Sequence, residues 1–415
     1  MKVYENQSDL KDLFLKVTDV LLPGTLKEKI LIYDIDTTAF EAANGCVFLI
    51  GAEYYETGEL KVKQFFSEDI REELEIIEQF LSFAKDYDVL LNYKGNSFDI
   101  PFLAGRLDIL KSNPDLTHLR TISYDLFDEI RPVKMGLGLV STKIDVLRKL
   151  TGQIVTEKIS GENISKFYVQ HIARTKLKNL IAIANTPDNS GFIGDYEPKY
   201  LDDDLAHISV SENPSFLQDV LNRNRDNMES VIYIARLAHI FNMRKGFYNV
   251  ELCNISCNST DNDSICIGIS LPSLNYDLNY SDPNSSKDNI LFLKLYIQEV
   301  ALKQFYINYR DYFYFTAEDM AMHKSVAEFA DKNSKKKATP QTAYANITGN
   351  FVKIPSQYIK EENKKEGCLY KESYESGNYY LPVNNILNMN NENLKMLTYF
   401  CILEKYKDSL SEILI

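Results

Sequence analysis

Two acidic residues stand at the end of a short apolar run, where they could hold a metal ion. The run ILIYDID places Asp34 and Asp36 two residues apart, so both side chains leave the same face of a strand. Carboxylates ~5–7 Å apart repel each other, and beside a core they are costly unless they are neutralised. A hard divalent cation such as Mg²⁺ neutralises them by binding their oxygens. The alternative is a solvent-facing pair in which Asp36 or Thr37 caps the next turn.

A third carboxylate follows a second apolar run. The segment NYKGNSFDIPFL contains a strand end, a glycine turn and Asp99, with Pro101 in the first turn of a helix. Asp99 is either the N-cap of that helix or a third metal ligand that reaches the same sheet edge. Both interpretations stay open on the sequence alone.

The elements around these acids predict a mixed sheet with helices packed on it. The runs ILIYDID, CVFLIGAEYY and LKVKQFF are typical of strands, and the turn at residues 56–58 predicts an antiparallel hairpin between the last two. An amphipathic helix over residues 70–86, a strand VLLNYKG and a helix over residues 99–110 follow. The pattern predicts an α/β fold in which the first three strands are antiparallel.

The chain divides, on its pattern, into three parts. Its 415 residues predict two or three domains. We expect an N-terminal helix within residues 1–28, an α/β domain over 29–245 with an irregular insertion at about 185–215, and a smaller α+β domain over 246–415. In that last part we expect a hairpin after Gly246 and helices near 289–310 and 317–331. Two motifs there have open interpretations: the lysines at 335–337 as a solvated loop or a phosphate contact, and the aromatic run at 306–315 as buried or base-stacking.

The charge and cysteine content limit the function. With 46 Lys plus Arg and 59 Asp plus Glu, the net charge is −13. An acidic chain needs a local basic groove or a bound metal to contact nucleic acid. Six cysteines without a CxxC pair favour free thiols in a reducing compartment, and no apolar run is long enough for a membrane helix. We therefore expect a cytoplasmic protein with no membrane partner.

The ordered set of these segments resembles a known family. They are similar to the YprB-type ribonuclease-H-like domain. In chain order, the similar segments are YDIDTT, the VFLIG hairpin, QFF, an acidic helix, YKGNSFDIPFL, STKIDVLRKLTG, ISGENISKFY and FLQDVLNRNRDNMESVIYIARL. That group belongs to the DEDD superfamily of metal-dependent 3′–5′ exonucleases. The resemblance covers residues 29–241 and implies a ribonuclease-H-like fold. The segment 308–355 resembles a C-terminal region of some bacterial proteins and implies no activity.

The resemblance implies a site and also a departure from the family pattern. Asp34 and Asp36 match the first motif, usually Asp-x-Glu, and Asp99 matches the second. The third motif, His-Asn-x-x-Asp, aligns its His with Arg223 and its Asp with Asn227. Arg223 cannot act as a base near neutral pH, although it could hold a phosphate, and an amide oxygen is a weaker ligand than a carboxylate. The neighbouring Asp226 points ~100° away around a helix.

The resemblance therefore implies a metal-dependent nuclease with a damaged third motif. Its cofactor is Mg²⁺ or Mn²⁺, one or two ions held by Asp34, Asp36, Asp99 and Asn227, with Arg223 as a further site residue. Its partner is nucleic acid, DNA or RNA, with a single-stranded 3′ end as substrate. The alternative is a catalytically inactive nucleic-acid-binding or scaffold protein on the same fold.

Overall fold

The computed structural model describes most of the chain, which divides into two compact units. The described residues are 1–112, 114–154, 163–166, 168–169, 172, 214–253, 264–270, 290–362 and 368–405. Unit 1 comprises residues 1–132 and 141–237, and unit 2 begins at Ala238 and also takes in Val133–Val140. Of the expected insertion at about 185–215, residues 185–213 lie outside the described residues, and residues 214 and 215 begin a helix instead. No described helix is long and apolar enough to cross a membrane.

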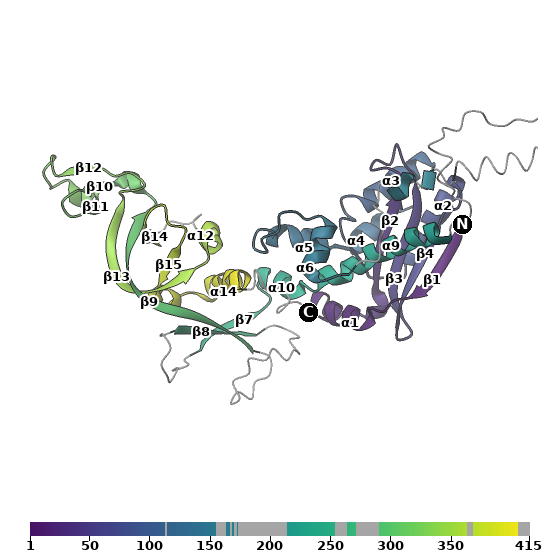
Figure 1. Cartoon of the computed structure of the whole chain (residues 1–415), viewed down its shortest axis with the longest axis horizontal. Helices are drawn as coiled ribbons and strands as arrows, with labels where there is room; N and C mark the ends of the chain where they lie inside the picture. The colour runs from purple at the N-terminus through teal and green to yellow at the C-terminus, as the bar shows by residue number, and fades with distance from the viewer. Residues whose placement is uncertain are drawn as a thin grey trace, which may run out of the picture. The chain divides into compact units, whose positions relative to one another are not determined.

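Unit 1 is built on a six-stranded mixed sheet in the order β1-β4-β3-β2-β5-β6 (Figure 1). The antiparallel pairs β1–β4, β4–β3 and β3–β2 form one half, and β5 and β6 continue it in parallel to β2. Its strands are β1 (Lys2–Gln7), β2 (Ile30–Thr37), β3 (Val47–Glu56), β4 (Glu59–Phe66), β5 (Val89–Asn92) and β6 (Ser123–Asp125). The predicted α/β fold with antiparallel leading strands is confirmed. Strand β1 was not predicted.

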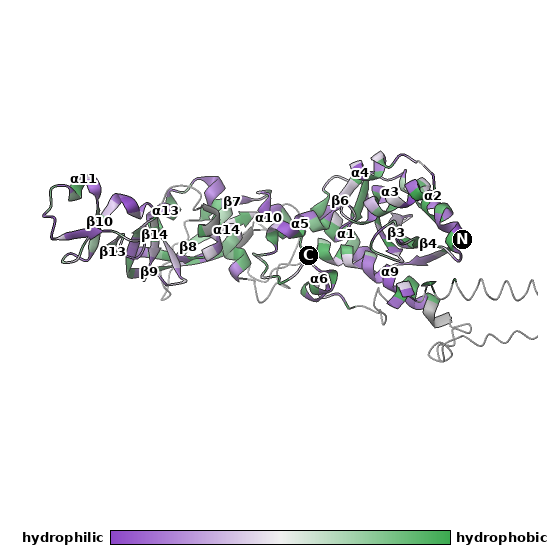
Figure 2. Ribbon diagram, turned by 90° about the horizontal axis from the view of Figure 1, so that it is seen from above, coloured by the Kyte–Doolittle hydropathy of each residue, from purple (hydrophilic) through white to green (hydrophobic). Residues whose placement is uncertain are grey.

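Helices cover both faces of this sheet. They are α1 (Lys11–Leu21), α2 (Glu73–Ala84), α3 (Asp99–Ile109), α4 (Thr117–Ile122), α5 (Leu126–Val133), α6 (Ile144–Thr151) and α9 (Pro214–Ala235). On one face, Leu31, Tyr33 and Ile35 pack into a core with side chains of α2, α3 and α4. On the other face, Phe48 and its neighbours pack against α9. Hydrophobic and hydrophilic residues both occur along α9, as expected of a helix with one buried side (Figure 2).

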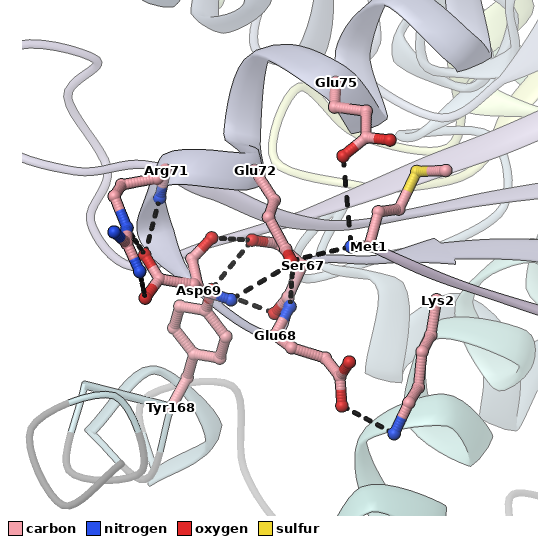
Figure 3. Close-up of polar contacts among 9 residues, drawn as sticks. All are labelled: Met1, Lys2, Ser67, Glu68, Asp69, Arg71, Glu72, Glu75 and Tyr168. Atoms are coloured by element: carbon pink, nitrogen blue, oxygen red, sulfur yellow. Dashed lines mark hydrogen bonds and ion pairs between the residues drawn. The ribbon is translucent and has the colours of Figure 1, made fainter. Parts of the chain in front are cut away.

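The turn after β4 is held by a dense set of polar contacts (Figure 3). The side chain of Asp69 caps the turn at residues 70–72, and Glu72 accepts hydrogen bonds from the backbone of residues 68 and 69. Glu72 also pairs with the Met1 amino group at 2.7 Å. The Tyr168 hydroxyl donates to the carbonyl of Ser67 at 3.0 Å, and its ring stacks on Phe48 at 4.3 Å. These contacts fix Tyr168 against Phe48 and the residue that follows β4.

Unit 2 is richer in strands than its sequence pattern predicts. A sheet in the order β13-β15-β14-β9-β8-β7 and a second, three-stranded sheet in the order β11-β10-β12 form it. The first contains β7 (Asn249–Cys253), β8 (Ser264–Ser270), β9 (Ile290–Tyr306), β13 (Tyr344–Ile354), β14 (Cys368–Lys371) and β15 (Tyr379–Pro382). The second contains β10 (Tyr312–Phe315), β11 (Met320–His323) and β12 (Lys335–Lys337). The helices are α10 (Ala238–Arg244), α11 (Lys324–Ala327), α12 (Ser356–Glu362), α13 (Val383–Leu387) and α14 (Asn391–Lys405).

The hairpin expected after Gly246 is present as β7 and β8, but the two helices expected beyond it are wrong. Residues 290–306 form the long strand β9, in which buried Leu293 and Leu295 alternate with exposed Lys294 and Tyr296. This alternation with a period of two is typical of a strand. The segment contains so many apolar residues that its sequence also fits the spacing of a helix. The segment 317–331 forms β11 and only a short helix, α11. The division between the units precedes α10, whereas the sequence placed the boundary after it.

Candidate active site

Strand β2 places Asp34 and Asp36 on the face of the sheet that α9 covers. Because side chains alternate along a strand, Tyr33 and Ile35 enter the opposite core and the two acids point toward α9. Asp34 lies opposite Gly51 of β3 in the ladder, and Asp36 lies opposite Leu49. Asp36 is buried, with 9% of its surface exposed. The acids are therefore not the solvent-facing pair that the sequence left open.

Gly51 allows α9 to approach this face closely. A Cβ atom built on Gly51 would lie 2.1 Å from the side-chain oxygen of Asn224 and 2.7 Å from the terminal methyl carbon of Met228. Any side chain at position 51 would therefore push the helix away from the sheet. The buried amide of Asn224 is held in turn by Gln64 of β4, whose Nε2 donates to its Oδ1 at 2.8 Å. The missing side chain thus sets the distance between α9 and the acids.

Two asparagines of α9 donate hydrogen bonds to Asp34. The Nδ2 of Asn227 lies 3.0 Å from Oδ2 of Asp34, and the Nδ2 of Asn224 lies 3.3 Å from the same oxygen. Burial raises the pKa of Asp34 to about 6, while the bond from Asn227 and the charges of Arg223 and Arg148 work in the opposite direction. Asn227 and Asp34 thus meet, as the register of the third motif predicts.

Arg148 of α6 fixes the orientation of the Asn227 amide, and sequence reasoning missed it. Its Nη2 donates to Oδ1 of Asn227 at 2.8 Å, and its Nε donates to Oγ of Ser230 at 2.9 Å. Turning the amide over would set its NH₂ against a guanidinium and its oxygen against a carboxylate, so the hydrogen-bond partners define its orientation. The amide oxygen of Asn227 therefore faces Arg148 and not the carboxylates. The only sequence signal was an arginine beside the apolar residues of a short amphipathic helix.

Asp99 begins α3 and belongs to the same group of acids. It is buried, with 6% of its surface exposed. Burial raises its pKa well above the ordinary value, and the charges of Asp34, Asp125 and Asp36 raise it further. Asp34 and Asp36 thus lie near enough to Asp99 to act on its charge, with Asp36 buried and Asp34 half-buried. Phe98 is the N-cap of α3 and Asp99 is its first helical residue, so Asp99 is not the N-cap that the sequence left open.

Asp125 organises the loop that precedes Asp99, a role that no motif in the sequence indicates. Its carboxylate accepts hydrogen bonds from the backbone N–H groups of Lys94 at 2.7 Å, Asn96 at 3.1 Å and Phe127 at 2.9 Å. Lys94 adopts a left-handed conformation with φ of 68°. Asparagine adopts this conformation more readily than lysine.

Arg223 lies one turn before Asn227, and its Nε is 4.0 Å from Oδ1 of Asp36. It is half-buried and faces the acids, so the site residues of α9 do not lie on a solvated surface. Asp226 is also buried, with 2% exposure. It lies near Glu229, whose pKa burial raises to about 7, with Asp226 adding to the rise. The structure thus places Arg223 with the acids and Asp226 with a different group.

The carboxylates of Asp34, Asp36 and Asp99 fit one hard cation in their chemistry, since they are oxygen donors that belong to one group of acids. Within the described ranges, however, no three His, Cys, Asp or Glu side chains stand close enough together to hold a metal ion. Uncompensated carboxylates repel one another, so binding a cation requires these side chains to draw together. The two arginines nearby already supply part of the compensating charge.

Comparison with known proteins supports the fold of unit 1. Residues 31–185 match the family model RNase_H_2, described as the RNase_H superfamily. The mixed sheet and its flanking helices are consistent with a ribonuclease-H-like fold in this region. Its similarity to that superfamily covers the strands and helices that carry Asp34, Asp36 and Asp99. Among curated proteins, none matches the chain.

A solved structure with weak similarity is a family B DNA polymerase from the hyperthermophilic archaeon Pyrobaculum calidifontis. It is 13% identical, with a TM-score of 0.28. The match covers 67% of this chain and 34% of the polymerase chain, so it spans about a third of that protein.

Proposed function

We propose that unit 1 is a metal-dependent nuclease that removes nucleotides from the 3′ end of a single-stranded nucleic acid. The observation that carries the proposal is a group of three carboxylates within the domain: Asp36 and Asp99 are buried and Asp34 is half-buried. Burial, together with the charges of Asp34, Asp125 and Asp36, raises the pKa of Asp99. Buried carboxylates are costly unless a cation neutralises them. The ribonuclease-H-like fold of residues 31–185 supports the same activity.

The proposed site holds one Mg²⁺ or Mn²⁺ ion through Asp34, Asp36 and Asp99. Such an ion polarises the scissile phosphate and lowers the pKa of a water molecule that it binds. Arg223, 4.0 Å from Asp36, is placed to hold a phosphate of the substrate through its planar guanidinium. Arg223 cannot take a proton from water near neutral pH, so the site has no base at that position.

Asn227 makes the proposed activity low. Its oxygen accepts a hydrogen bond from Arg148, and its nitrogen donates to Asp34. Asn227 therefore contributes no oxygen in this arrangement, although its position in the third motif is that of a ligand. Losing even an outer-shell partner of a metal site typically costs ~10–100-fold in affinity or activity, and a lost ligand should cost no less. A second ion is not expected to bind tightly.

A second candidate function is a catalytically inactive nucleic-acid-binding protein. The chain of hydrogen bonds from Arg148 through Asn227 to Asp34 favours it, because it places cationic and donor groups beside Asp34 without a metal. In this candidate the acids remain as a structural group. Arg148 and Arg223 then neutralise the carboxylates in place of a cation.

The decisive experiment is Mn²⁺-dependent digestion of 5′-labelled single-stranded DNA and RNA by the whole chain. We expect slow shortening from the 3′ end by the wild type and none by Asp34→Asn. Asn227→Asp should raise the rate by at least ~10-fold, because it restores a ligand. Adding Arg223→His should raise it further, by supplying a base whose pKa lies near neutrality.

The control is Asp226→Ala, which removes the neighbouring carboxylate. If the wild type cleaves and this variant does not, Asp226 is the metal ligand, and the alignment of the third motif with Arg223 and Asn227 is wrong. If the restored double variant folds correctly but cleaves neither DNA nor RNA, the nuclease proposal fails. Retained binding of the same strands would then support the inactive binding protein.

A further inference from the structure

Two motifs that the candidate active site does not use meet on one small sheet of unit 2. The aromatic run supplies β10 and the lysine run supplies β12, and the two strands pair in antiparallel fashion. Phe313 lies opposite Lys337, and Phe315 lies opposite Lys335. The lysines are therefore part of a strand and not the solvated loop that was one of the two interpretations of their sequence. Residues directly opposite in an antiparallel pair share a face, so aromatic rings and ammonium groups stand side by side.

The two faces of this sheet differ. Lys335, Lys337 and Phe313 share one face, and the Nζ of Lys335 lies 5.4 Å from the centre of the Phe313 ring. Lys336 lies on the other face, opposite Tyr314. The hydroxyl of Tyr314 donates to Asp319 at 2.6 Å, so an acid already occupies that side. On the first face, the paired lysine and phenylalanine side chains have no contact of this kind with an acid among the residues of these pairs.

A pocket of about 620 Å³ opens on the first face. Its lining comes from β10, α11 and the segment that leads to β12, and comprises Phe313, Lys324, Ser325, Glu328, Ala330, Lys332 and Lys335. Lys335 builds the wall, because its ammonium donates to the carbonyls of Ala327 and Ala330. Lys324 lies 3.5 Å from Asp311. Exposed Lys332 and Lys337 are left to meet a ligand.

The balance of charge and exposure points to an anionic ligand with flat apolar parts. The lining has three lysines and one acid, Glu328, in a chain whose net charge is −13. Beside it, Phe329 is 90% exposed and Val326 is 61% exposed. Large apolar side chains exposed next to cations mark an interaction surface. Phosphates paired with bases that stack on aromatic rings match this combination.

We infer that this lysine–aromatic pocket, the lining residues together with Lys337 and Phe329, binds single-stranded nucleic acid. Lys332 and Lys337 contact backbone phosphates, and a base stacks on Phe329 at the rim. The contact is independent of sequence, because every base has a face that stacks and every nucleotide has a phosphate. The choice of nucleic acid among polyanions rests on the function proposed for unit 1.

The test measures binding without cleavage. Wild-type full-length chain in EDTA is titrated against fluorescein-labelled oligo-dT and oligo-U strands of about 12 nucleotides, a length within the range that single-strand sites cover. Fluorescence anisotropy gives the affinity at several salt concentrations. Because no divalent cation is present, failure of the nuclease proposal leaves this measurement unchanged.

The variants are matched by strand and charge. Lys337→Gln and Lys332→Gln should each weaken binding and lower the salt slope by about 0.7, the value for one lost phosphate contact on a single strand. Lys336→Gln removes the same charge from the same strand on the opposite face, and should leave the slope unchanged. Phe329→Ala should weaken binding about fivefold or more without changing the slope, because stacking is not ionic. Circular dichroism checks that each variant is folded.

Three outcomes would overturn the inference. Equal effects of Lys336→Gln and Lys337→Gln would mean that only the general charge matters. Unchanged affinity in both Lys332→Gln and Lys337→Gln would place binding elsewhere on the chain. Binding of heparin or inorganic phosphate without binding of either oligonucleotide would assign the pocket to another anion.

Discussion

The amide nitrogen of Asn227 donates a hydrogen bond to a carboxylate oxygen of Asp34 at 3.0 Å. This contact places a neutral donor at the position that the third-motif resemblance assigns to a carboxylate. It stabilises the charged form of half-buried Asp34 by a hydrogen bond, where a carboxylate would repel it. The same contact costs the site an oxygen ligand. Stability without a cation and strong binding of a cation are therefore alternatives at this position.

Asn227→Asp should lower the stability of the protein without a cation and raise its affinity for a cation. Without divalent cations the variant should melt at a lower temperature than the wild type, because two carboxylates then stand about 3 Å apart. With saturating Mn²⁺ its melting temperature should rise by more than that of the wild type, since a ligand that binds only the folded state stabilises it. Thermal melts with and without Mn²⁺, and calorimetry with Mn²⁺, measure both effects.

The matched control is Asn222→Asp, on the same helix, where the side chain contacts Gln218 and not the acids. Its melting temperature should not depend on Mn²⁺ more than that of the wild type. If Asn227→Asp gains no affinity for Mn²⁺, the acids do not form a cation site.

Arg148→Met should remove the group that orients Asn227. Arg148 is 4% exposed, and its loss leaves the Asn227 oxygen and the Ser230 hydroxyl without this partner. We expect a loss of about 1–3 kcal/mol in the free energy of unfolding. The pKa of Asp34, now about 6, should rise, because the charge of Arg148 lowers it.

Carboxyl NMR titration of Asp34 and urea denaturation test these two effects. Lys149→Met, at the exposed next position, is the control and should change neither quantity. A pKa of Asp34 that stays the same in Arg148→Met would show that the guanidinium does not act on the acids.

Local patterns in the sequence account for the part of the site that lies on one strand. Asp34 and Asp36 share a face because of the period of two, and this requires no tertiary information. Arg223 and Asn227 share a face of α9 because they are four residues apart. In contrast, the contact between Arg148 and Asn227 joins residues 79 apart in the sequence, and no local pattern encodes it.

The errors in unit 2 have a related cause. Strand β9 contains many apolar residues that satisfy helical and strand spacing at once, and its pairing with β8 and β13 decides between them. Strand β1 was missed because only its pairing with β4 defines it, and its residues are mostly exposed. Pairing between distant strands is tertiary information, which propensity does not contain.

Lys94→Asn should stabilise unit 1. Lys94 has φ of 68°, which is unfavourable for lysine and more readily adopted by asparagine. We expect a gain of about 0.5–1 kcal/mol, reduced by the loss of the contact between Lys94 and the Phe127 ring, 5.4 Å away. Urea denaturation measures the change.

Lys94→Met separates the cost of the left-handed backbone conformation from the contribution of the contact with the Phe127 ring. It keeps the unfavourable backbone conformation and loses only the charge, so it should give no gain. Equal stability of the Asn and Met variants would show that the left-handed conformation costs little here.

Glu53→Gln should make unit 1 more stable at high pH. Glu53 is fully buried on β3, and burial raises its pKa to about 8, with Glu229 adding to the rise. The unfolded chain has a carboxyl pKa near ~4.3, so between these values the folded state holds a proton that the unfolded state has lost. The contribution of Glu53 to the free energy of unfolding therefore falls as the pH rises from about 4.5 to about 8 and is constant above it.

The variant carries no such proton, so the difference in unfolding free energy between Glu53→Gln and the wild type should grow in favour of the variant over this range. Urea denaturation at pH 5, 7 and 9, as round values that bracket the pKa of about 8, measures the difference. Taking the difference cancels the contribution of Asp34, which both chains retain. Glu229 interacts with Glu53, so the loss of the Glu53 charge also makes the Glu229 carboxylate less costly at high pH and adds to the difference in the same direction. Glu56→Gln, at the exposed end of the same strand, is the control and should show no change with pH. A constant difference for Glu53→Gln would mean that Glu53 is ionised in the folded protein at neutral pH, and that Arg225 neutralises it more strongly than burial opposes it.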